Sequence, residues 1–347
     1  MAKRVTVYEI ASACGVSQPT VSRILGRGPA AERHSAETRR LVLETAKRLG
    51  YRPNAAARAM GRNRFGAIGL LLSKREHAST LPPLFLDSVL DVCNERDLNL
   101  SLLRSDDATL TDSKRVPRLL RESSTDGLLI DYTHAIPPRL LEIVDRHRIP
   151  AIWLNSKQPA DCIRPDDEQG GYDAARLLIE RGHTKIAYLD MSHGPDADYR
   201  HYSADDRRVG YERALAEARL KPNIVQAESG ETVPSAERVA FCRRLLEQVD
   251  RPTGVVCYGH VNHLVAAALL VGLTVPEDLS VVTFADAPTN AISIEGVSGF
   301  LLPQREIGSA AVTMLLEKIA DPSASVSPLV MPMTPFAGTT LAAPAAG

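Results

Sequence analysis

Residues 6–23 of the chain read Thr-Val-Tyr-Glu-Ile-Ala-Ser-Ala-Cys-Gly-Val-Ser-Gln-Pro-Thr-Val-Ser-Arg, and this stretch decides the fold of the N-terminal region. In its first half, apolar residues recur at the spacing of one helix face, at Val7, Ile10, Ala11 and Cys14. A helix with one apolar face needs other elements to cover that face. We therefore expect a short amphipathic helix that packs into a small core.

The second half of the stretch predicts a second helix after a tight turn. Gly15 is expected to end the first helix, because glycine readily adopts the left-handed conformation of helix ends. Ser17 stands at an N-cap position, and Pro19 falls in the first turn, where a missing N–H costs little. Two short helices joined by a glycine-containing turn form a helix-turn-helix, whose second helix enters the DNA major groove. The residues it would present are Gln18, Pro19, Thr20, Ser22 and Arg23, and the cap residue Ser17 is also expected to contact DNA.

A helical hairpin inside an ordinary core is the alternative reading of this stretch, and the charge distribution argues against it. Residues 1–64 hold 13 of the 41 Lys and Arg residues and 4 of the 42 Asp and Glu residues, a balance of +9. The rest of the chain has a balance of −10, which the net charge of −1 conceals. A basic head on an acidic body is typical of a head that binds a polyanion. Near the start of that head, the hydroxyls of Thr6 and Tyr8 are placed to contact DNA phosphates.

A third helix and a short basic segment complete the head. Ser35 is expected to begin the helix and Gly50 to end it, with an inner face at Val42, Thr45, Ala46 and Leu49. Pro53 then blocks continuation, and Asn54 caps a two-turn helix over residues 55–60. A helix this short is marginal alone, so we expect it to fold on DNA, with Met60 as its one long apolar side chain. A plain interdomain linker is the alternative.

From residue 65 onward, strands alternate with helices, which predicts parallel sheets covered on both faces. The expected strands are 67–72, 98–103, 127–130, 151–154, 186–189, 224–226, 254–258 and 279–284, with an edge strand over 330–333. The expected helices are one from residue 139 and those over 170–181, 204–218, 236–249, 261–271 and 307–319. These are two consecutive α/β units, too long for one sheet. The predicted fold class is an all-α helix-turn-helix head followed by an α/β body of two doubly wound lobes with a cleft at their strand ends.

Composition excludes several other classes of protein. The chain has 347 residues, of which 44% are hydrophobic, but no run of them approaches the roughly 18 residues of a membrane span. No signal peptide opens the sequence. The five cysteines are scattered without metal-ligand spacing, as in a reduced cytoplasmic protein. We therefore expect a cytoplasmic, nucleoid-associated protein with no cofactor, no metal and no membrane contact.

Six motifs in order identify the chain as similar to the lactose-repressor/galactose-repressor family of bacterial transcription regulators. They are Val-Ser-x-x-Thr-Val-Ser-Arg at 16–23, Tyr-x-Pro-Asn-x-x-Ala at 51–57, Pro-Asp-Asp-x-x-Gly at 165–170, Gly-His-x-x-Ile-Ala at 182–187, Arg-x-x-Gly-Tyr at 207–211 and Val-Pro-Glu-Asp-Leu-Ser-Val-Val-x-Phe at 275–284. The resemblance covers about residues 5–340. It implies a body resembling periplasmic binding proteins, and a homodimer whose two heads read a pseudo-palindromic operator.

The resemblance also assigns expected roles within the DNA-binding region. Gln18 and Pro19 match the family's base-reading pair, and Arg23 matches the arginine that reads guanine. Ala57 and Met60 match the hinge-helix residues that enter the minor groove, where the family usually has Leu at the second position. We accordingly divide the chain into a DNA-binding domain (1–50), a hinge helix and linker (51–64), a two-lobed effector-binding and dimerisation domain (65–340) and a disordered tail (341–347).

In the family a small molecule binds between the lobes and alters operator affinity, and four positions here correspond to that pocket. Arg207 matches the pocket arginine, although a surface residue on an amphipathic helix is the alternative. Asn155 and His260 stand where the family commonly has Asp, and Asp286 is retained near the end of a strand. The pocket is less anionic and more apolar than a sugar site, which predicts an acidic or partly apolar effector. A regulator whose effector pocket has degenerated is the alternative.

Two other functions fit parts of the sequence. An α/β enzyme is one, but no GxGxxG, GxxxxGK[ST], GxSxG or HExxH motif occurs. His260 and His263 could seat a metal at i, i+3, yet no carboxylate or cysteine lies at ligand spacing. A transporter's solute-binding protein is the other, and it would carry no basic helical head. The sequence therefore predicts a non-enzymatic, sequence-specific DNA-binding regulator, a repressor whose operator affinity an effector modulates.

Overall fold

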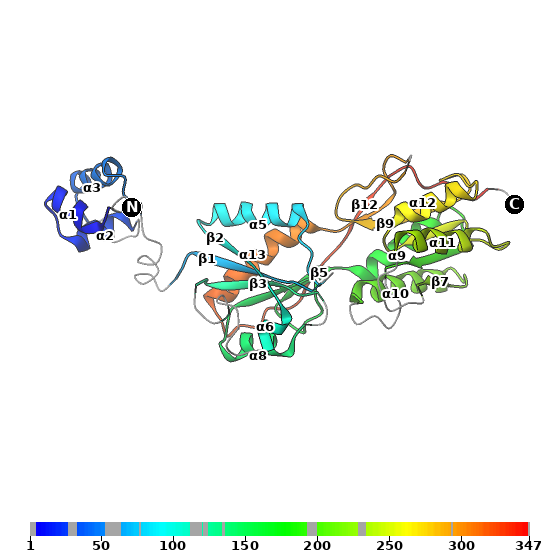
Figure 1. Ribbon diagram of the computed structural model, residues 1–347, viewed down its shortest axis with the longest axis horizontal. Coiled ribbons are helices and arrows are strands. Elements are labelled where there is room, and N and C mark those ends of the chain that lie inside the picture. The colour runs from blue at the N-terminus through cyan, green and yellow to red at the C-terminus, as the bar shows by residue number, and fades with distance from the viewer. Residues whose placement is uncertain are drawn as a thin grey trace. The chain divides into compact units, whose positions relative to one another are not determined.

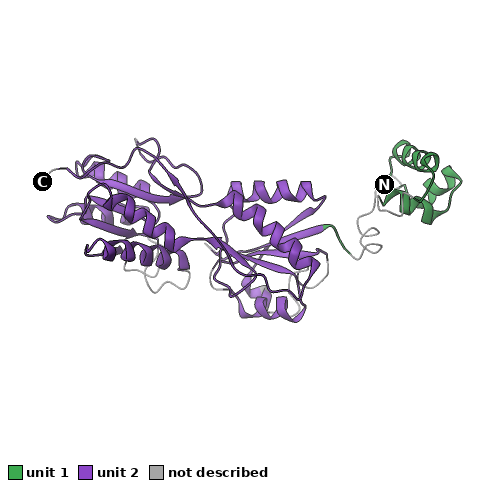
Figure 2. Cartoon of the chain, turned by 180° about the vertical axis from the view of Figure 1, so that it is seen from behind, with its two compact units in different colours: residues 1–66 green, residues 67–347 purple. Residues whose placement is uncertain are grey.

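The chain divides into two compact units, residues 1–66 and residues 67–347, in the computed structural model (Figures 1 and 2). The described residues are 5–26, 33–52, 64–75, 78–111, 120, 124–133, 136–192, 200–227, 234–292 and 294–345. Each unit has its own hydrophobic core.

The described part of the first unit contains three helices around one small core. They are α1 (Val7–Cys14), α2 (Gln18–Leu25) and α3 (Ala36–Arg48). The core consists of buried residues from all three helices, namely Ile10, Ala11, Val21, Ile24, Val42 and Ala46. The predicted face of the first helix is confirmed, because Val7 and Cys14 pack against this core. Leu49 was expected on the inner face of α3, but it follows the last helical turn and is 37% exposed.

The helix ends of this unit are set by side-chain caps. Thr6 and Glu9 form a capping box at the start of α1: the Glu9 N–H donates to Thr6 Oγ1 and the Thr6 N–H donates to Glu9 Oε2 at 2.8 Å. Gly15 ends α1 at φ +65°, and Ser17 caps α2 by accepting from the Thr20 N–H. Ser35 caps α3 in the same way. The predicted ends at Gly15, Ser17 and Ser35 are therefore confirmed.

The second unit contains two six-stranded sheets, each with helices on both faces (Figure 1). The first lobe is built from the strands and helices β1 (Ala67–Ser73), α5 (Pro83–Glu95), β2 (Asn99–Ser105), α6 (Asp107–Thr111), β3 (Gly127–Asp131), α8 (Pro138–Arg146), β4 (Ala151–Leu154), β5 (Cys162–Pro165), α13 (Gln304–Ala320) and β11 (Leu329–Met331). Its strand order is β11-β5-β4-β3-β1-β2, and the pairings are parallel. Alternate strand residues pack under α5 and α13 on one face and under α6 and α8 on the other.

The second lobe repeats this arrangement. Its elements are α9 (Asp167–Ile179), β6 (Ile186–Asp190), α10 (Tyr202–Glu217), β7 (Asn223–Gln226), α11 (Ser235–Leu246), β8 (Gly254–Cys257), α12 (Val261–Leu270), β9 (Ser280–Ala285), β10 (Gly299–Leu301) and β12 (Thr334–Phe336). The strand order is β12-β10-β9-β8-β6-β7, with only the β10–β12 pair antiparallel among these. Helices α11 and α12 cover one face, and α9 and α10 cover the other.

The chain passes between the lobes three times: from β5 to α9, from β10 to α13, and from β11 to β12. The sequence predicted two consecutive units, and this expectation is wrong for the last part of the chain. Helix α13 packs on the first sheet, and β11, predicted as an edge strand, joins the edge of that sheet beside β5. The carboxyl ends of strands from both sheets therefore lie close to connections shared by the two lobes.

The C-terminal segment differs from the predicted disordered tail over its first two residues. The buried side chain of Thr340 donates to the Val281 carbonyl, and the Ala342 N–H donates to Ser280 Oγ at 3.0 Å. His183, from the Gly-His motif, lies 2.9 Å from Thr253 Oγ1 through Nδ1 and donates from Nε2 to the Ala342 carbonyl at 3.0 Å. These hydrogen bonds hold the segment against the second lobe.

Candidate DNA-binding and effector sites

Helix α2 separates a buried face from an exposed one. Val21 and Ile24 are at most 2% exposed and fix the helix in the core of the first unit. The residues on its outer side are exposed, namely Gln18, Pro19, Ser22 and Arg23. The fold therefore presents an amide, a proline ring, a hydroxyl and a guanidinium together on a short capped helix, as a helix-turn-helix requires.

The predicted phosphate contacts divide into caps and free surface groups. Thr6 Oγ1 and Ser17 Oγ both serve as N-cap acceptors, and Ser17 Oγ also lies 2.9 Å from the hydroxyl of Thr20. Tyr8 is 65% exposed on α1. The structure thus assigns Thr6 and Ser17 a local structural role that is compatible with a phosphate contact. The predicted hinge residues Asn54, Ala57 and Met60 lie outside the described residues.

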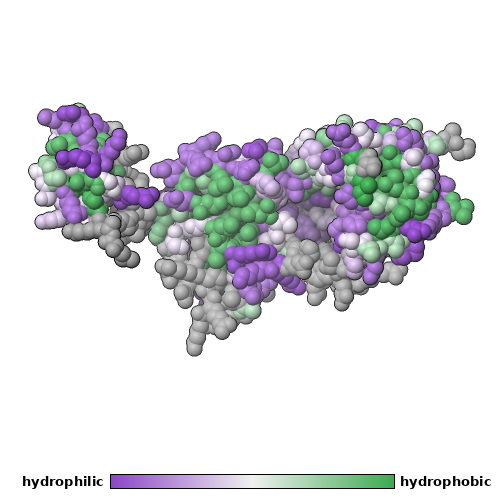
Figure 3. Space-filling model, turned by 45° about the horizontal axis from the view of Figure 1, so that its top comes forward, coloured by the Kyte–Doolittle hydropathy of each residue, from purple (hydrophilic) through white to green (hydrophobic). Residues whose placement is uncertain are grey.

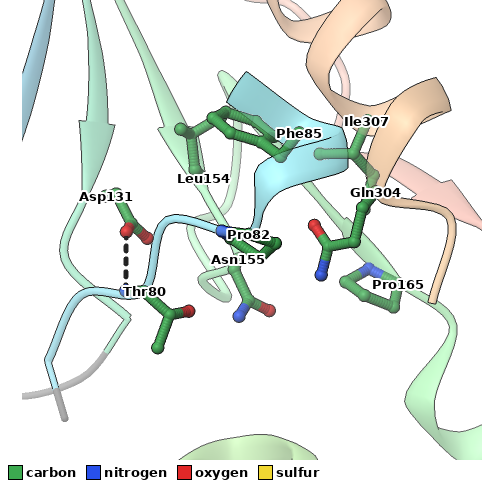
Figure 4. Close-up of a pocket in the computed structure, with 9 residues that line it drawn as sticks. All are labelled: Thr80, Pro82, Phe85, Asp131, Leu154, Asn155, Pro165, Gln304 and Ile307. Atoms are coloured by element: carbon green, nitrogen blue, oxygen red, sulfur yellow. Dashed lines mark hydrogen bonds between the residues drawn. The ribbon is translucent and has the colours of Figure 1, made fainter. Parts of the chain in front are cut away.

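An open pocket lies in the first lobe beside the connections to the second, and its empty space of about 360 Å³ includes adjoining solvent (Figure 4). Apolar side chains form most of its wall, and Thr80, Asp131, Asn155 and Gln304 supply its polar groups. The apolar lining residues are Pro82, Phe85, Leu154, Pro165 and Ile307. A mostly apolar concavity with a few polar groups is the usual form of a small-molecule site.

Asp131 is the one ionisable residue among the described residues that line this pocket. It ends β3, is only 4% exposed, and accepts a hydrogen bond from the Thr80 N–H at 3.0 Å through Oδ2. Burial raises the pKa of Asp131 to about 8, against a smaller lowering by the Thr80 hydrogen bond. The sequence analysis missed Asp131, although an acidic residue at the carboxyl end of a buried parallel strand was a usable signal.

Asn155 connects the pocket to the second lobe. It follows β4, lines the pocket, and adopts φ +47°, a left-handed conformation that Asn tolerates better than most residues. Its Oδ1 accepts from the Tyr202 hydroxyl of α10 at 2.9 Å, and its carbonyl accepts from His201 Nε2 at 3.3 Å. Close by, Lys157 pairs with Asp206 of α10 at 2.6 Å. The predicted pocket residue Asn155 is therefore both a wall of the pocket and a contact between lobes.

The predicted effector residue Arg207 is 6% exposed and belongs to a cluster inside the second lobe. Its Nε donates to Asp167 Oδ1 at 2.8 Å, and its guanidinium carbon lies 4.3 Å from the ring centre of Phe284 and 5.1 Å from that of Tyr258. The alternative of a surface residue is wrong. Burial raises the pKa of Asp167, and Arg207 opposes this by favouring the carboxylate. Asp167 Oδ2 is buried and has no hydrogen-bond partner in the part of the chain that the structure describes.

Close backbone contact between α9 and α10 positions this ion pair. A Cβ on Gly210 would lie 1.9 Å from the Glu168 carbonyl oxygen, and one on Gly171 would lie 2.0 Å from the Arg207 carbonyl oxygen. Glycine at both positions therefore lets the two helices approach until Arg207 reaches Asp167. The glycine of the Arg-x-x-Gly-Tyr motif thus has a packing role.

The other two predicted effector residues do not line the pocket. Asp286 is exposed, and its Oδ1 accepts a hydrogen bond from Gln304 Nε2 at 2.6 Å. Asp286 therefore contacts the pocket indirectly, through the side chain of the lining residue Gln304. His260 precedes α12 at φ +61°, with its ring 5.7 Å from that of His263 in an edge-to-face arrangement. Across the described residues, no group of three His, Cys, Asp or Glu side chains could hold a metal ion.

Comparison with known proteins agrees with this arrangement. The model for bacterial regulatory proteins of the lacI family matches residues 6–54, and that for the periplasmic binding protein-like domain matches residues 175–341. The HTH-type transcriptional repressor PurR of Vibrio atlanticus (strain LGP32) is 30% identical over 327 residues, which cover 91% of this chain and 92% of that protein. This chain belongs to the lacI family of bacterial regulatory proteins. The PurR repressor of Aliivibrio salmonicida (strain LFI1238) is 28% identical to this lacI family member over 329 residues, with the same shares covered.

Solved structures share the fold of this lacI family member. The lac repressor dimer bound to operator and the anti-inducer ONPF superimposes with a TM-score of 0.78 at 22% identity, covering 98% of this chain and all of that chain. The transcriptional regulator CelR in complex with cellobiose gives a TM-score of 0.62 at 21% identity, covering 97% of this chain. The predicted fold class is confirmed, and the chain is a DNA-binding transcriptional regulator with an effector-binding body. None of the described helices is both long and apolar enough to cross a membrane.

Proposed function

We propose that this lacI family member is a repressor that binds a pseudo-palindromic operator as a homodimer, with an affinity set by a small molecule in the pocket beside Asn155. The observation that carries the proposal is the exposed face of α2, where Gln18 and Arg23 stand opposite the buried Val21 and Ile24. A helix fixed in this way can offer polar groups to base edges without losing its own packing.

Within that proposal, the exposed side chains have distinct roles at DNA. Arg23 reads a guanine and Gln18 an adenine through paired hydrogen bonds, whereas Pro19 packs on a thymine methyl group. Thr6, Tyr8, Ser17, Thr20 and Ser22 contribute backbone or base contacts through their hydroxyls. We further propose that Asn54, Ala57 and Met60 contact DNA, the last two in the minor groove. The excess of positive charge in residues 1–64 supports strong binding to phosphates.

Apolar surface on the second unit supports a homodimer. Figure 3 shows apolar patches on both lobes, and exposed large apolar residues include Leu90 on α5 and Leu269 and Leu270 on α12. Patches of this kind on a regulator are suited to association with a second copy. Two copies related by a two-fold axis present α2 twice, and a two-fold site in DNA is the matching target.

The body supports regulation because one pocket adjoins the contacts that link the lobes. Lobes joined by three chain passages can change their angle, and a ligand shifts that angle only if it binds one arrangement better than the other. Arg207, His260 and Asp286 remain proposed effector residues, with Asp286 acting through Gln304. We place this non-catalytic regulator in the cytoplasm, without a cofactor.

Selection of sequences bound from random duplex DNA by the full-length protein tests the proposal. A two-fold symmetric consensus, bound with an affinity that falls steeply between 50 and 200 mM salt, is expected. Repetition with a metabolite panel would then identify a compound that changes binding to that consensus. Binding without a consensus, or no binding to any duplex at low ionic strength, would refute the assignment of α2 as a reading helix.

A further inference from the structure

Asp131 lines the pocket, and one of its two carboxyl oxygens has no hydrogen-bond donor among the described residues. Oδ2 accepts from the Thr80 N–H, and within the described part of the chain no donor reaches Oδ1. Figure 4 shows the carboxyl group on the side of the pocket where Thr80 and Asn155 also lie. A carboxyl that is 4% exposed and borders an open pocket has its remaining acceptor available to an occupant of that pocket.

Among the described residues, no charged side chain balances Asp131. The causes acting on its ionisation are burial and the Thr80 backbone hydrogen bond, with no cation among them. The other polar groups of the pocket are neutral, namely Thr80, Asn155 and Gln304. An isolated carboxylate among apolar walls is unfavourable unless a positive charge pairs with it. The described lining of the pocket thus offers a ligand one carboxyl group that can become negative, and no cation.

The walls limit what else the ligand can carry. Phe85, Leu154 and Ile307 offer no hydrogen bonds, so a polyhydroxylated sugar would lose more hydration than the three neutral polar groups could replace. An acidic ligand would find no cation among the described lining residues and could bind only while the Asp131 carboxyl stayed protonated. A compact apolar body with a single donor group matches the lining, and a charged donor forms the stronger hydrogen bond to a carboxylate.

We propose that this pocket binds an organic amine: its ammonium group donates to Asp131 Oδ1 and its apolar body packs on Phe85, Leu154 and Ile307. This inference rests on the proposed effector function and names the chemical class of the effector. The sequence predicted an acidic or a partly apolar effector. The amine proposal agrees with a partly apolar effector and takes the place of an acidic one.

The proposal predicts a specific pH dependence. Because burial raises the pKa of Asp131 to about 8, an amine must displace the carboxyl proton when it binds near neutral pH. Amines stay protonated through this range, so binding should tighten by about 10- to 100-fold between pH 6 and pH 8. A neutral alcohol can accept from the protonated carboxyl and should change much less, and a carboxylate ligand should weaken as the pH rises.

Matched probes on the full-length protein test these signs. We would titrate 2-phenylethylamine, 2-phenylethanol and phenylacetate, and then isopentylamine, isopentanol and isovalerate, by calorimetry at pH 6, 7 and 8. In at least one of the two series, the amine should bind at least tenfold more tightly than the corresponding alcohol at pH 8. At pH 7 its binding should release a proton from the Asp131 carboxyl. Asp131→Asn should abolish this preference while keeping an acceptor for the Thr80 N–H. Asp145→Asn, on the exposed side of α8, is the matched control and should change nothing.

Equal or tighter binding of an alcohol or a carboxylate, an unchanged amine affinity in Asp131→Asn, or no binding of either amine at 20 mM would overturn the inference. These outcomes are separate from those that test the proposed function. If the protein binds its consensus DNA and responds to a metabolite that is not an amine, the proposed function stands and the amine proposal is refuted. Failure to bind any duplex would remove the function regardless of the probe results.

Discussion

The ion pair between Arg207 and Asp167 gives the sharpest prediction about the stability of the second lobe. The pair is buried, with side chains 7% and 0% exposed and a 2.8 Å hydrogen bond. Arg207→Gln would leave the Asp167 carboxylate buried without its cation, next to an Oδ2 that already has no donor. Removing one partner of a buried pair costs about 3–5 kcal/mol. We expect a loss of that size in the free energy of unfolding at pH 7.

The second partner decides whether charge or packing causes the loss. Asp167→Asn removes the stranded charge, so the double variant Asp167→Asn/Arg207→Gln should be more stable than the sum of the single losses by about 2 kcal/mol. Lys157→Ala provides a control, because its pair with Asp206 is largely exposed on the lysine side and is worth no more than about 1 kcal/mol.

The single variant should also acquire a pH dependence of known sign. Without Arg207 the pKa of Asp167 rises further above its unfolded value, so the folded protein holds a proton that the unfolded chain releases. Stability of Arg207→Gln should therefore fall as the pH rises from 5 to 8, by up to about 1.4 kcal/mol per pH unit. Urea unfolding followed by circular dichroism at each pH measures this. A variant as stable as the parent at pH 7, or additive single losses, would refute the reasoning.

Three further predictions concern other parts of the chain. Arg23→Ala should lower discrimination at one base pair per half-site by about 1–3 kcal/mol in binding assays on substituted operators, and a uniform loss across all operators would contradict a base contact. Gly210→Ala should destabilise the body by about 3 kcal/mol, because its Cβ would lie 1.9 Å from the Glu168 carbonyl oxygen, whereas Gly259→Ala, with 3.7 Å of room, should leave the unfolding temperature unchanged. Burial lowers the pKa of His183, so its contribution to stability is present above pH 6.5 and is lost as the pH falls through the lowered pKa. Unfolding curves of His183→Gln should lack this acid sensitivity, and equal slopes for parent and variant would disprove it.

The head could be predicted almost completely from its sequence because its determinants are local. Caps and end signals act over three or four residues, so Gly15, Ser17 and Ser35 identified the helix ends. The prediction that Leu49 lies on the inner face was wrong because apolar periodicity does not show where a helix ends. Helix α3 ends at Arg48, and Leu49 is left partly exposed.

The body could be predicted in its elements but not in its connections. Apolar runs marked the central strands, since a strand buried on both faces leaves a continuous signal. The short strand β5 has no such run and was missed. The return of α13 and β11 to the first sheet is a non-local pairing that no periodicity encodes. Asp131 was missed for a related reason, because only the assembled pocket distinguishes it from other polar strand ends.

Asn155 shows how one side chain can couple the pocket to the lobes. Its amide oxygen accepts from the Tyr202 hydroxyl of α10, and burial raises the pKa of that phenol, which keeps Tyr202 a donor. The amide nitrogen of Asn155 is a separate donor that a ligand in the pocket can use without displacing Tyr202. A ligand that instead competes for the oxygen would release α10 from the first lobe. An aspartate at position 155 has no donor to offer and would place a charge near Asp131 in the same pocket. The asparagine therefore permits either sign of response, and the orientation of the ligand's own hydrogen-bonding groups decides which arrangement of the lobes it favours.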